Sequence, residues 1–259
     1  MIRYSANLSL LYPDRPFLER FAAAKASGFS SVEFMFPYAA GLEAVQEALT
    51  RHQLNLVLFN LPAGYWEGGE RGIAILPSRR EEFREGVDEA IRYAKQLGCT
   101  RINCLAGILP ADLSEDDAWD TLTDNTTYAA DRLAEHGIYL LVEAVNSLDI
   151  PGFFLNTPAR VEMLLDKIQR PNVRIQYDVY HAQRMQGDLI ATFKRLASRI
   201  GHVQIADNPG RHEPGTGEIH YDNVLQAFDQ CGYEGYVGLE YNPAGETDAG
   251  LRWLPREKR

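Results

Sequence analysis

YLLVEAV (139–145) is the first of four apolar runs that each hold one oxygen-bearing side chain near their end; the others are VRIQYDVYH (173–181), HVQIAD (202–207) and YVGLEYN (236–242). The four side chains are Glu143, Asp178, Gln204 and Glu240. They are spaced 35, 26 and 36 residues apart, and each spacing fits one strand followed by one helix. The pattern is typical of one mouth of a (β/α)8 barrel, where the carboxyl ends of the strands bring such side chains together.

Strand-like and helix-like segments alternate along the whole chain. Eight runs are predicted as strands: 3–8, 31–36, 54–61, 101–107, 139–145, 173–180, 202–207 and 236–241. Apolar residues at helical spacing fill the intervals, for example over 42–52 and 158–169. The strand runs are almost continuously apolar, which indicates a parallel sheet buried on both faces. Eight such units in 259 residues favour a closed α/β barrel, the TIM barrel, and a single domain over 1–259.

Composition excludes several classes of partner. The formal net charge of −10 argues against nucleic acid, because phosphate binding needs a basic surface. No stretch approaches the roughly 18 apolar residues of a membrane span, so we expect no membrane association. Three cysteines, without a C-x-x-C motif, indicate reduced thiols and a cytoplasmic protein.

Several catalytic and cofactor motifs do not occur in the sequence. The first predicted strand is not followed by G-x-G-x-x-G, so neither nicotinamide nor flavin is expected as a cofactor. The P-loop, the G-x-S-x-G elbow of hydrolases and H-E-x-x-H also do not occur. No predicted strand contains a lysine, which argues against a Schiff-base aldolase.

The four strand-end side chains favour a divalent metal site. A carboxylate with apolar neighbours is costly to bury unless a cation or hydrogen bonds compensate its charge. One such carboxylate alone is as easily explained by an arginine partner or a helix cap, but three carboxylates and an amide on four successive strands favour a shared cation. An all-oxygen ligand set selects Mg²⁺ or Mn²⁺ over zinc or copper. Further polar residues stand at or near strand ends: Asn7, Glu33, Asn60, Asn103 and Asp207.

Several long motifs resemble those of a known family. They are LLVEAVN (140–146), IQYDVYHAQ (175–183), GHVQIADNPGRHEPGTGEI (201–219), GLEYNP (238–243) and NLPAGYWEGGERGIA (60–74). These stretches are similar to the xylose-isomerase-like TIM barrels, and specifically to the hydroxypyruvate isomerases. The resemblance extends over essentially the whole chain.

The resemblance implies an isomerase that converts hydroxypyruvate to tartronate semialdehyde (2-hydroxy-3-oxopropanoate) without nicotinamide. It implies that Glu143 and Glu240 carry protons, and that Glu143, Asp178, Gln204 and Glu240 bind the metal. Many relatives in the wider superfamily have histidine where Gln204 stands, although an amide oxygen is also a competent ligand for a hard ion. Removing a proton from one carbon and returning one to its neighbour requires such carboxylates, and a cation stabilises the enediolate formed between the two steps.

Other residues are expected around the substrate. The resemblance suggests that His181 contacts a substrate oxygen, with packing at the barrel rim as the alternative. Arg211 is a candidate for binding the substrate carboxylate, although a loop arginine can equally be solvated. Glu70 and Arg71 lie in a long loop that we expect to cover the site, where Glu70 would contact substrate. The remaining candidates are Glu33, as a supporting or purely structural residue, and Trp66 and Phe36, as walls of the site.

Alternative functions remain open. A 2-oxotetronate isomerase would use the same site on an acid one carbon longer. A ketose 3-epimerase or an inosose dehydratase would use the same ligands for another reaction. An enzyme like endonuclease IV would need a histidine-rich zinc site and a basic face. A non-catalytic barrel would bind metal without turnover, and a homo-oligomer is possible in every case.

Overall fold

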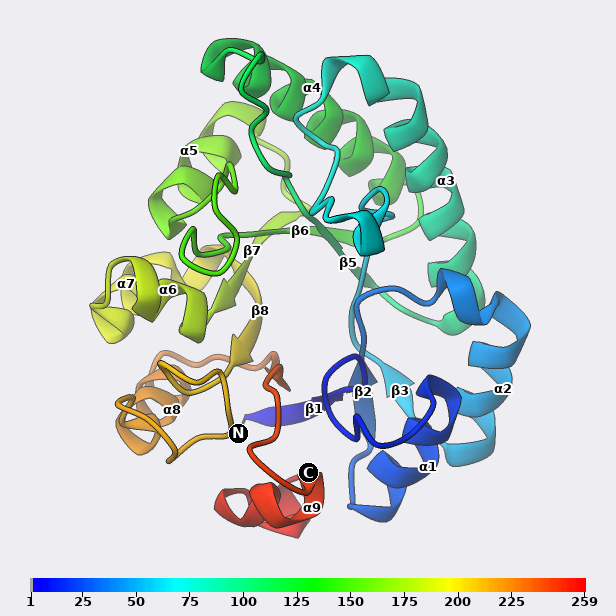
Figure 1. Cartoon of the computed structure of the whole chain (residues 1–259), viewed down its shortest axis with the longest axis vertical. Coiled ribbons are helices and arrows are strands. Elements are labelled where there is room, and N and C mark those ends of the chain that lie inside the picture. Colours follow the sequence, from blue (N-terminus) through cyan, green and yellow to red (C-terminus); the bar gives the residue numbers. More distant parts are fainter. Residues whose placement is uncertain (1) are drawn as a thin grey trace.

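The computed structural model describes residues 2–259. Every paired strand in it is parallel to its neighbours. The strands are β1 (Arg3–Asn7), β2 (Ser31–Glu33), β3 (Asn55–Leu56), β4 (Phe59–Asn60), β5 (Arg101–Cys104), β6 (Tyr139–Glu143), β7 (Val173–Asp178), β8 (Ile200–Ile205) and β9 (Tyr236–Leu239). They pair in the order β3-β2-β1-β9-β8-β7-β6-β5-β4. Figure 1 shows these strands around a central axis with the helices outside them.

The predicted strand over 54–61 closes the barrel in two parts. Its first half, β3, pairs with β2, and its second half, β4, pairs with β5. The main-chain N–H of Val57 still donates to Val32 O at 2.9 Å, while that of Leu61 already donates to Asn103 O at 2.8 Å. The nine segments therefore form the eight strands of a barrel, and the predicted TIM-barrel fold is confirmed.

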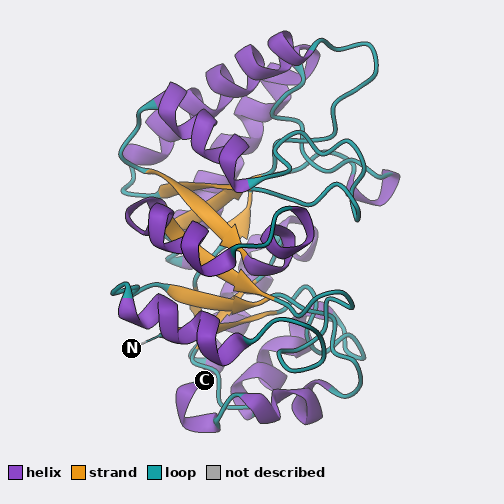
Figure 2. Cartoon of the chain, turned by 90° about the vertical axis from the view of Figure 1, so that its left-hand side faces the viewer, coloured by secondary structure: helices purple, strands orange, loops and turns teal. Residues whose placement is uncertain are grey.

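The helices separate the strands and cover the outside of the barrel. They are α1 (Phe17–Ala26), α2 (Leu42–His52), α3 (Arg80–Leu97), α4 (Glu115–Ala134), α5 (Pro158–Ile168), α6 (Val179–Met185), α7 (Leu189–Leu196), α8 (Tyr221–Gln230) and α9 (Thr247–Gly250). Among the helices of residues 2–259, none combines the length and the apolarity needed to span a bilayer. The longest loops leave the ends to which the strand arrows point (Figure 2).

The strand predicted over 173–180 is shorter than expected. It ends at Asp178, and α6 begins at once with Val179. The Asp178 side chain causes this change, because it accepts the main-chain N–H of His181 and so caps the new helix. His181 is consequently fixed one turn above the strand end.

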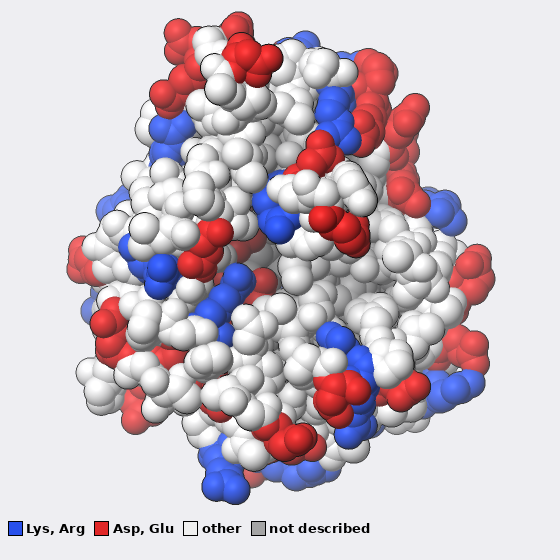
Figure 3. All heavy atoms as spheres, in the orientation of Figure 1, with Lys and Arg blue, Asp and Glu red and all other residues white. Residues whose placement is uncertain are grey.

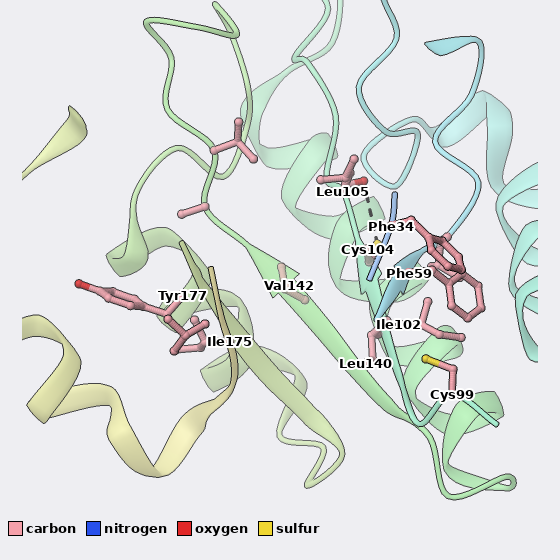
Figure 4. Packing of buried hydrophobic residues seen from close by; sticks show 14 of the residues in the cluster. Phe34, Phe59, Cys99, Ile102, Cys104, Leu105, Leu140, Val142, Ile175 and Tyr177 are labelled. Atoms are coloured by element: carbon pink, nitrogen blue, oxygen red, sulfur yellow. Dashed lines mark hydrogen bonds between the residues drawn. The ribbon is translucent and has the colours of Figure 1, made fainter. Parts of the chain in front are cut away.

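Successive residues of a strand point into two different environments, outside and inside the barrel. Leu140 and Val142 of β6 belong to the main apolar core between the sheet and the helices, together with Phe59 and Ile102 (Figure 4). Leu141, between them, belongs to a separate small cluster with Val57 and Leu58. Other inward-facing positions hold buried polar residues: Ser5, Glu33, Asn103, Gln176, His202 and Gln204. The inward-facing positions are therefore mostly polar, with one small apolar cluster among them.

Candidate active site

A cavity of about 310 Å³ lies at the carboxyl ends of the strands. Its lining includes three of the four predicted metal ligands, Glu143, Gln204 and Glu240. The other polar members are Asn7, Glu33, Asn60, Arg71, Asp149, Gln176, His181 and Arg211. Figure 3 views the molecule from this side, and the surface there is hollowed and mixes basic with acidic groups.

Glu143 ends β6 and is held by two amides. Its Oε2 accepts Asn103 Nδ2 at 3.0 Å and Gln176 Nε2 at 2.9 Å. Burial raises the pKa of Glu143 well above its usual value, and the nearby charges of Glu240 and Asp178 raise it further. A carboxyl group in this setting is well suited to carry a proton at neutral pH.

Glu240 follows β9 on the other side of the cavity. Burial raises its pKa to about 8, although the guanidinium of Arg211 opposes this shift. Nη2 of Arg211 lies 3.2 Å from Glu240 Oε1. Because β7 and β8 separate β6 from β9, Glu143 and Glu240 enter the same cavity from different parts of its wall.

Asp178 is buried at the end of β7 and is not part of the cavity lining. Its Oδ1 accepts the His181 N–H at 3.1 Å, and its Oδ2 lies 3.8 Å from His181 Nε2. Burial raises the pKa of Asp178 to about 6, and the charge of Arg211 limits the rise. Asp178 therefore combines a capping role with a position close to the two catalytic candidates.

The protonation state of His181 follows from Asn146. Asn146 Oδ1 accepts two main-chain N–H groups, from Leu148 at 3.1 Å and Asp149 at 2.8 Å, which fixes the orientation of the amide. Its Nδ2 therefore points to His181 Nδ1, which must be the accepting nitrogen. Burial lowers the pKa of His181 well below its usual value, with Arg211 and Arg184 adding to the effect. The ring is thus neutral and carries its proton on Nε2.

Glu33 forms a buried pair with His202. Its Oε2 lies 2.9 Å from His202 Nε2 and accepts Ser5 Oγ at 2.7 Å. Burial raises the pKa of Glu33, but the His202 ring and the hydrogen bonds from Gln204 and Ser5 outweigh burial and hold this pKa below its usual value. Glu33 also accepts Gln204 Nε2 at 2.8 Å, so it orients the Gln204 amide.

Gln204 lines the cavity with its amide already engaged on both sides. Its Nε2 donates to Glu33 and its Oε1 accepts Gln176 Nε2 at 2.6 Å. The oxygen keeps one lone pair for a further partner. Gln176, which contacts both Gln204 and Glu143, was not predicted. Its position two residues before Asp178, on the same face of the strand, is the signal that identifies it.

The Arg211 loop is organised by Asp207. The Asp207 carboxylate accepts four main-chain N–H groups, from Asn208, Gly215, Gly217 and Ile219, at 2.9 to 3.0 Å. Arg211 adopts a left-handed backbone conformation with φ of 55° and enters the cavity lining. Asp207 is therefore a scaffold for the loop and does not line the cavity.

The long loop after β4 contributes Arg71 and Trp66 to the cavity lining. The Arg71 guanidinium stacks on the Trp66 ring at 4.2 Å, and its Nη1 donates to Trp66 O and Glu70 O. Phe36 packs on Trp66 with ring centroids 4.9 Å apart but does not line the cavity. The Glu70 carboxylate is also outside the lining, because it binds the Arg79 guanidinium and the Tyr65 N–H. Glu70 thus holds the loop, and its predicted contact with substrate gains no support from this position.

The carboxylate cluster fits a divalent cation. One ligand atom from each of Glu143, Asp178 and His181 lies within 4.8 Å of the other two. Burial raises the pKa of Glu143, Asp178 and Glu240, and a divalent cation among them would favour their ionised forms. Distance alone admits His181 as a ligand, but its Nε2 carries a proton, so the carboxylates are the better ligands.

Comparison with known proteins identifies the family. The model of the xylose isomerase-like TIM barrel family matches residues 21–257. This chain belongs to that family. Hydroxypyruvate isomerase of Escherichia coli is 50% identical over 98% of each chain, and 2-oxo-tetronate isomerase of Cupriavidus necator is 41% identical over 98% of each chain. These full-length relatives of the family confirm the prediction that the chain is an isomerase.

Solved structures share the fold of this chain. A crystal structure from Brucella melitensis described as an AP endonuclease of family 2 is 42% identical, covers all of both chains and superposes with a TM-score of 0.97. The apo form of 3-keto-D-glucoside 4-epimerase from Escherichia coli is 22% identical over 98% of each chain, with a TM-score of 0.81. The latter likeness concerns the fold alone.

Proposed function

We propose that this enzyme interconverts hydroxypyruvate and 2-hydroxy-3-oxopropanoate. The observation that carries the proposal is the pair of buried carboxyl groups with raised pKa, Glu143 and Glu240, in the wall of one small cavity. The similarity to the hydroxypyruvate isomerase of Escherichia coli supports the choice of substrate. The cavity is at the small end of the range for ligand sites, which suits a three-carbon acid.

The reaction moves one proton between neighbouring carbons. One glutamate removes a proton from C3 of hydroxypyruvate, and the electron pair of that C–H bond forms the enediolate. The other glutamate returns a proton to C2, the C3 hydroxyl loses its proton and becomes the aldehyde, and the C2 oxygen gains a proton and becomes the hydroxyl group. Atoms and charge balance without an oxidant, in keeping with the expectation that no nicotinamide or flavin takes part.

His181 and Arg71 are positioned to orient the substrate. The Nε2–H of His181 would donate to the oxygen on C2, where negative charge develops. Arg211 is committed to Glu240, so Arg71 is the freer of the two arginines in the cavity lining. We propose that Arg71 binds the substrate carboxylate and that Arg211 acts mainly on the charge of Glu240, with a weaker contact to the substrate.

A divalent cation would compensate the negative charge of the carboxylates in the cavity. Glu143, Asp178 and Glu240 would hold it, with the Gln204 amide oxygen as a fourth ligand. Oxygen ligands select Mg²⁺ or Mn²⁺. The cation would supply positive charge beside the substrate oxygens and so stabilise the enediolate.

The relatives suggest 2-oxotetronate as a second candidate substrate. The 2-oxo-tetronate isomerases of Cupriavidus necator and Pectobacterium atrosepticum are each 41% identical to this chain. The same groups would act on that four-carbon acid if the cavity accepts one more hydroxymethyl carbon. Because the hydroxypyruvate isomerase of Escherichia coli is 50% identical, against 41% for these two enzymes, we propose the three-carbon acid as the main substrate.

The site gives no support to an endonuclease. Among residues 2–259, His181 is the one histidine in the cavity lining, whereas a multi-zinc site would need several. The surface around the cavity mixes both charges (Figure 3) and the chain carries a net charge of −10, which disfavours a DNA backbone. The buried, unpaired thiols of Cys99 and Cys104 accord with a cytoplasmic enzyme.

The decisive experiment follows proton transfer directly. The purified protein is incubated with hydroxypyruvate in D₂O, with and without Mg²⁺ or Mn²⁺, and observed by NMR. We expect 2-hydroxy-3-oxopropanoate with deuterium at C2. The absence of product and of exchange under every metal condition contradicts the proposal. Parallel incubation with 2-oxotetronate ranks the two substrates by kcat/KM.

A further inference from the structure

A second, strongly basic cavity lies at the opposite end of the barrel. Its volume is about 790 Å³, and it is lined by residues at the amino-terminal ends of β1, β5, β6, β7 and β8 and by α7. In Figure 2 this is the end from which the strand arrows start, away from the long loops. The lining contains five basic side chains and one acidic side chain, Glu234; the basic ones are Arg3, Arg101, Arg174, Lys194 and Arg195.

Main-chain carbonyls hold three of these guanidiniums in place. Arg101 begins β5, and its Nε reaches Gly201 O on β8 at 3.2 Å. Arg174 Nη1 donates to Ser198 O at 3.1 Å. Arg3 Nη2 donates to Glu234 O at 2.6 Å, and its guanidinium stacks on the Tyr236 ring at 4.3 Å. The three side chains are therefore ordered before any ligand arrives.

Gly201 brings two of the arginines together. Its carbonyl binds Arg101, and a Cβ at this position would lie 2.7 Å from the Cβ of Arg174. A glycine is thus needed for β7 and β8 to approach closely here. The Arg101 guanidinium and the stem of Arg174 consequently flank the same residue.

Within residues 2–259, most of the positive charge of the lining has no carboxylate partner. In the part of the chain that the structure describes, Arg195 forms an ion pair with Glu162. Arg3, Arg101, Arg174 and Lys194 form none with a described carboxylate. Among the described residues, both terminal nitrogens of Arg101, and Nε and Nη2 of Arg174, have no acceptor, so their N–H groups are available to a further partner. A concave wall that concentrates unpaired positive charge attracts anions.

We propose that this basic cavity binds a small molecule with two or more phosphate groups. Planar guanidiniums match phosphate oxygens bidentately, and several of them around one cavity suit a ligand of higher charge than a simple anion. The chain as a whole has a net charge of −10, so this local reversal of charge marks the cavity as specific for an anionic ligand. The site is independent of the isomerase cavity, because the two share no lining residue.

Calorimetric titration with tripolyphosphate at constant ionic strength tests the proposal. The metal-free protein is used, so that chelation does not contribute to the heat. We expect saturable binding at one site per chain, and a loss of affinity of at least about tenfold in Arg101→Gln and in Arg174→Gln, because each removes a charge-assisted hydrogen bond. Arg101→Lys should recover part of the loss by restoring the charge. Circular dichroism and isomerase turnover of each variant confirm that the barrel is intact.

Two controls separate this cavity from other basic groups. Arg92→Gln removes an exposed arginine of α3 and should leave the affinity unchanged. Arg71→Gln removes a cation from the isomerase cavity and should also leave it unchanged. Binding that is weakened by Arg71→Gln but not by Arg101→Gln overturns the proposal, as does the absence of saturable binding. Citrate, a tricarboxylate, is titrated for comparison. If citrate binds saturably and tripolyphosphate does not, the assignment to phosphate is contradicted.

Discussion

Nδ1 of His181 lies 2.6 Å from the side-chain nitrogen of Asn146, and the same ring nitrogen accepts the Asn146 main-chain N–H at 3.3 Å. Two donors on one ring nitrogen leave the imidazole proton on the other. His181 therefore presents an N–H toward the cavity, close to Glu143 and Asp178 at 3.8 Å from each. A residue outside the cavity lining thus determines what His181 can do inside it.

Asn146→Asp should impair catalysis by reversing this tautomer. A carboxylate can accept a hydrogen bond but cannot donate one, so the imidazole proton would move from Nε2 to Nδ1, and Nε2 could no longer donate to a substrate oxygen. We expect kcat to fall by about 10²–10⁴-fold, the range for loss of a positioned proton donor. Nitrogen NMR of the His181 ring gives the tautomer independently of activity. A variant with the proton moved to Nδ1 but wild-type kcat would rule out the donor role.

Glu143→Gln and Glu240→Gln should each abolish turnover without unfolding the protein. The amide is nearly isosteric but cannot accept a proton from carbon. Because burial raises the pKa of both carboxyl groups, their charged forms are disfavoured in the metal-free fold, and a neutral amide should leave its thermal midpoint unchanged or higher. Near wild-type turnover of either variant shows that its proton-transfer role is wrong.

Glu33→Gln is the matched contrast within the same barrel. Here the neighbours lower the pKa, so the charged carboxylate is the stabilised form. The amide keeps only one acceptor oxygen, so either His202 at 2.9 Å or Gln204 would face an N–H₂ group, and we expect a loss of about 1–3 kcal/mol in the free energy of unfolding. Urea denaturation measures it. If Glu33→Gln is as stable as the wild type, the pair with His202 contributes nothing to the fold.

The barrel and part of the site can be predicted from the sequence, but the pairing of the polar side chains cannot. The apolar runs ending at Glu143 and Glu240 predict both the barrel and the cavity, because strand periodicity and connection lengths are local properties. Sequence does not reveal that Gln176 contacts Glu143, since that contact depends on the register between β6 and β7. Glu70 shows the same limit, because its pairing with Arg79 depends on the path of the loop. The structure therefore adds the contacts between polar side chains that lie far apart in the sequence.

The stability of the metal-free protein should fall as the pH rises from about 5 to about 8. The folded-state pKa of Glu240 is about 8, above its usual value of 4.5, so the folded chain holds a proton that the unfolded chain releases. The contribution of Glu240 is therefore complete below the unfolded pKa and is lost as the pH passes through the folded one. Glu33 has the opposite sign, but its effect is confined to acid, below the unfolded pKa of a glutamate.

Thermal midpoints measured across this range check the prediction, and Glu240→Gln should flatten the profile. Mg²⁺ or Mn²⁺ should raise the midpoint more at about pH 8 than at about pH 5, because the ligands must be deprotonated to bind. Calorimetry in buffers of different ionisation enthalpy should show proton release on metal binding. A metal effect that is equal at both pH values would mean that these carboxylates are not the ligands.

Arg71→Gln should weaken the binding of the substrate carboxylate more than it slows the chemistry. Arg71 is fixed by its bonds to Trp66 O and Glu70 O and by stacking on Trp66, and it lines the cavity without a carboxylate partner in residues 2–259. We expect KM for hydroxypyruvate to rise by at least about tenfold, with a much smaller change in kcat, because the carboxylate contact is present in both the ground and transition states. Arg79→Gln is the control. It frees Glu70 in the same loop but removes no group from the cavity lining, so KM should change little. An equal rise in KM for both variants would indicate that loop order, and not the Arg71 charge, sets the affinity for substrate.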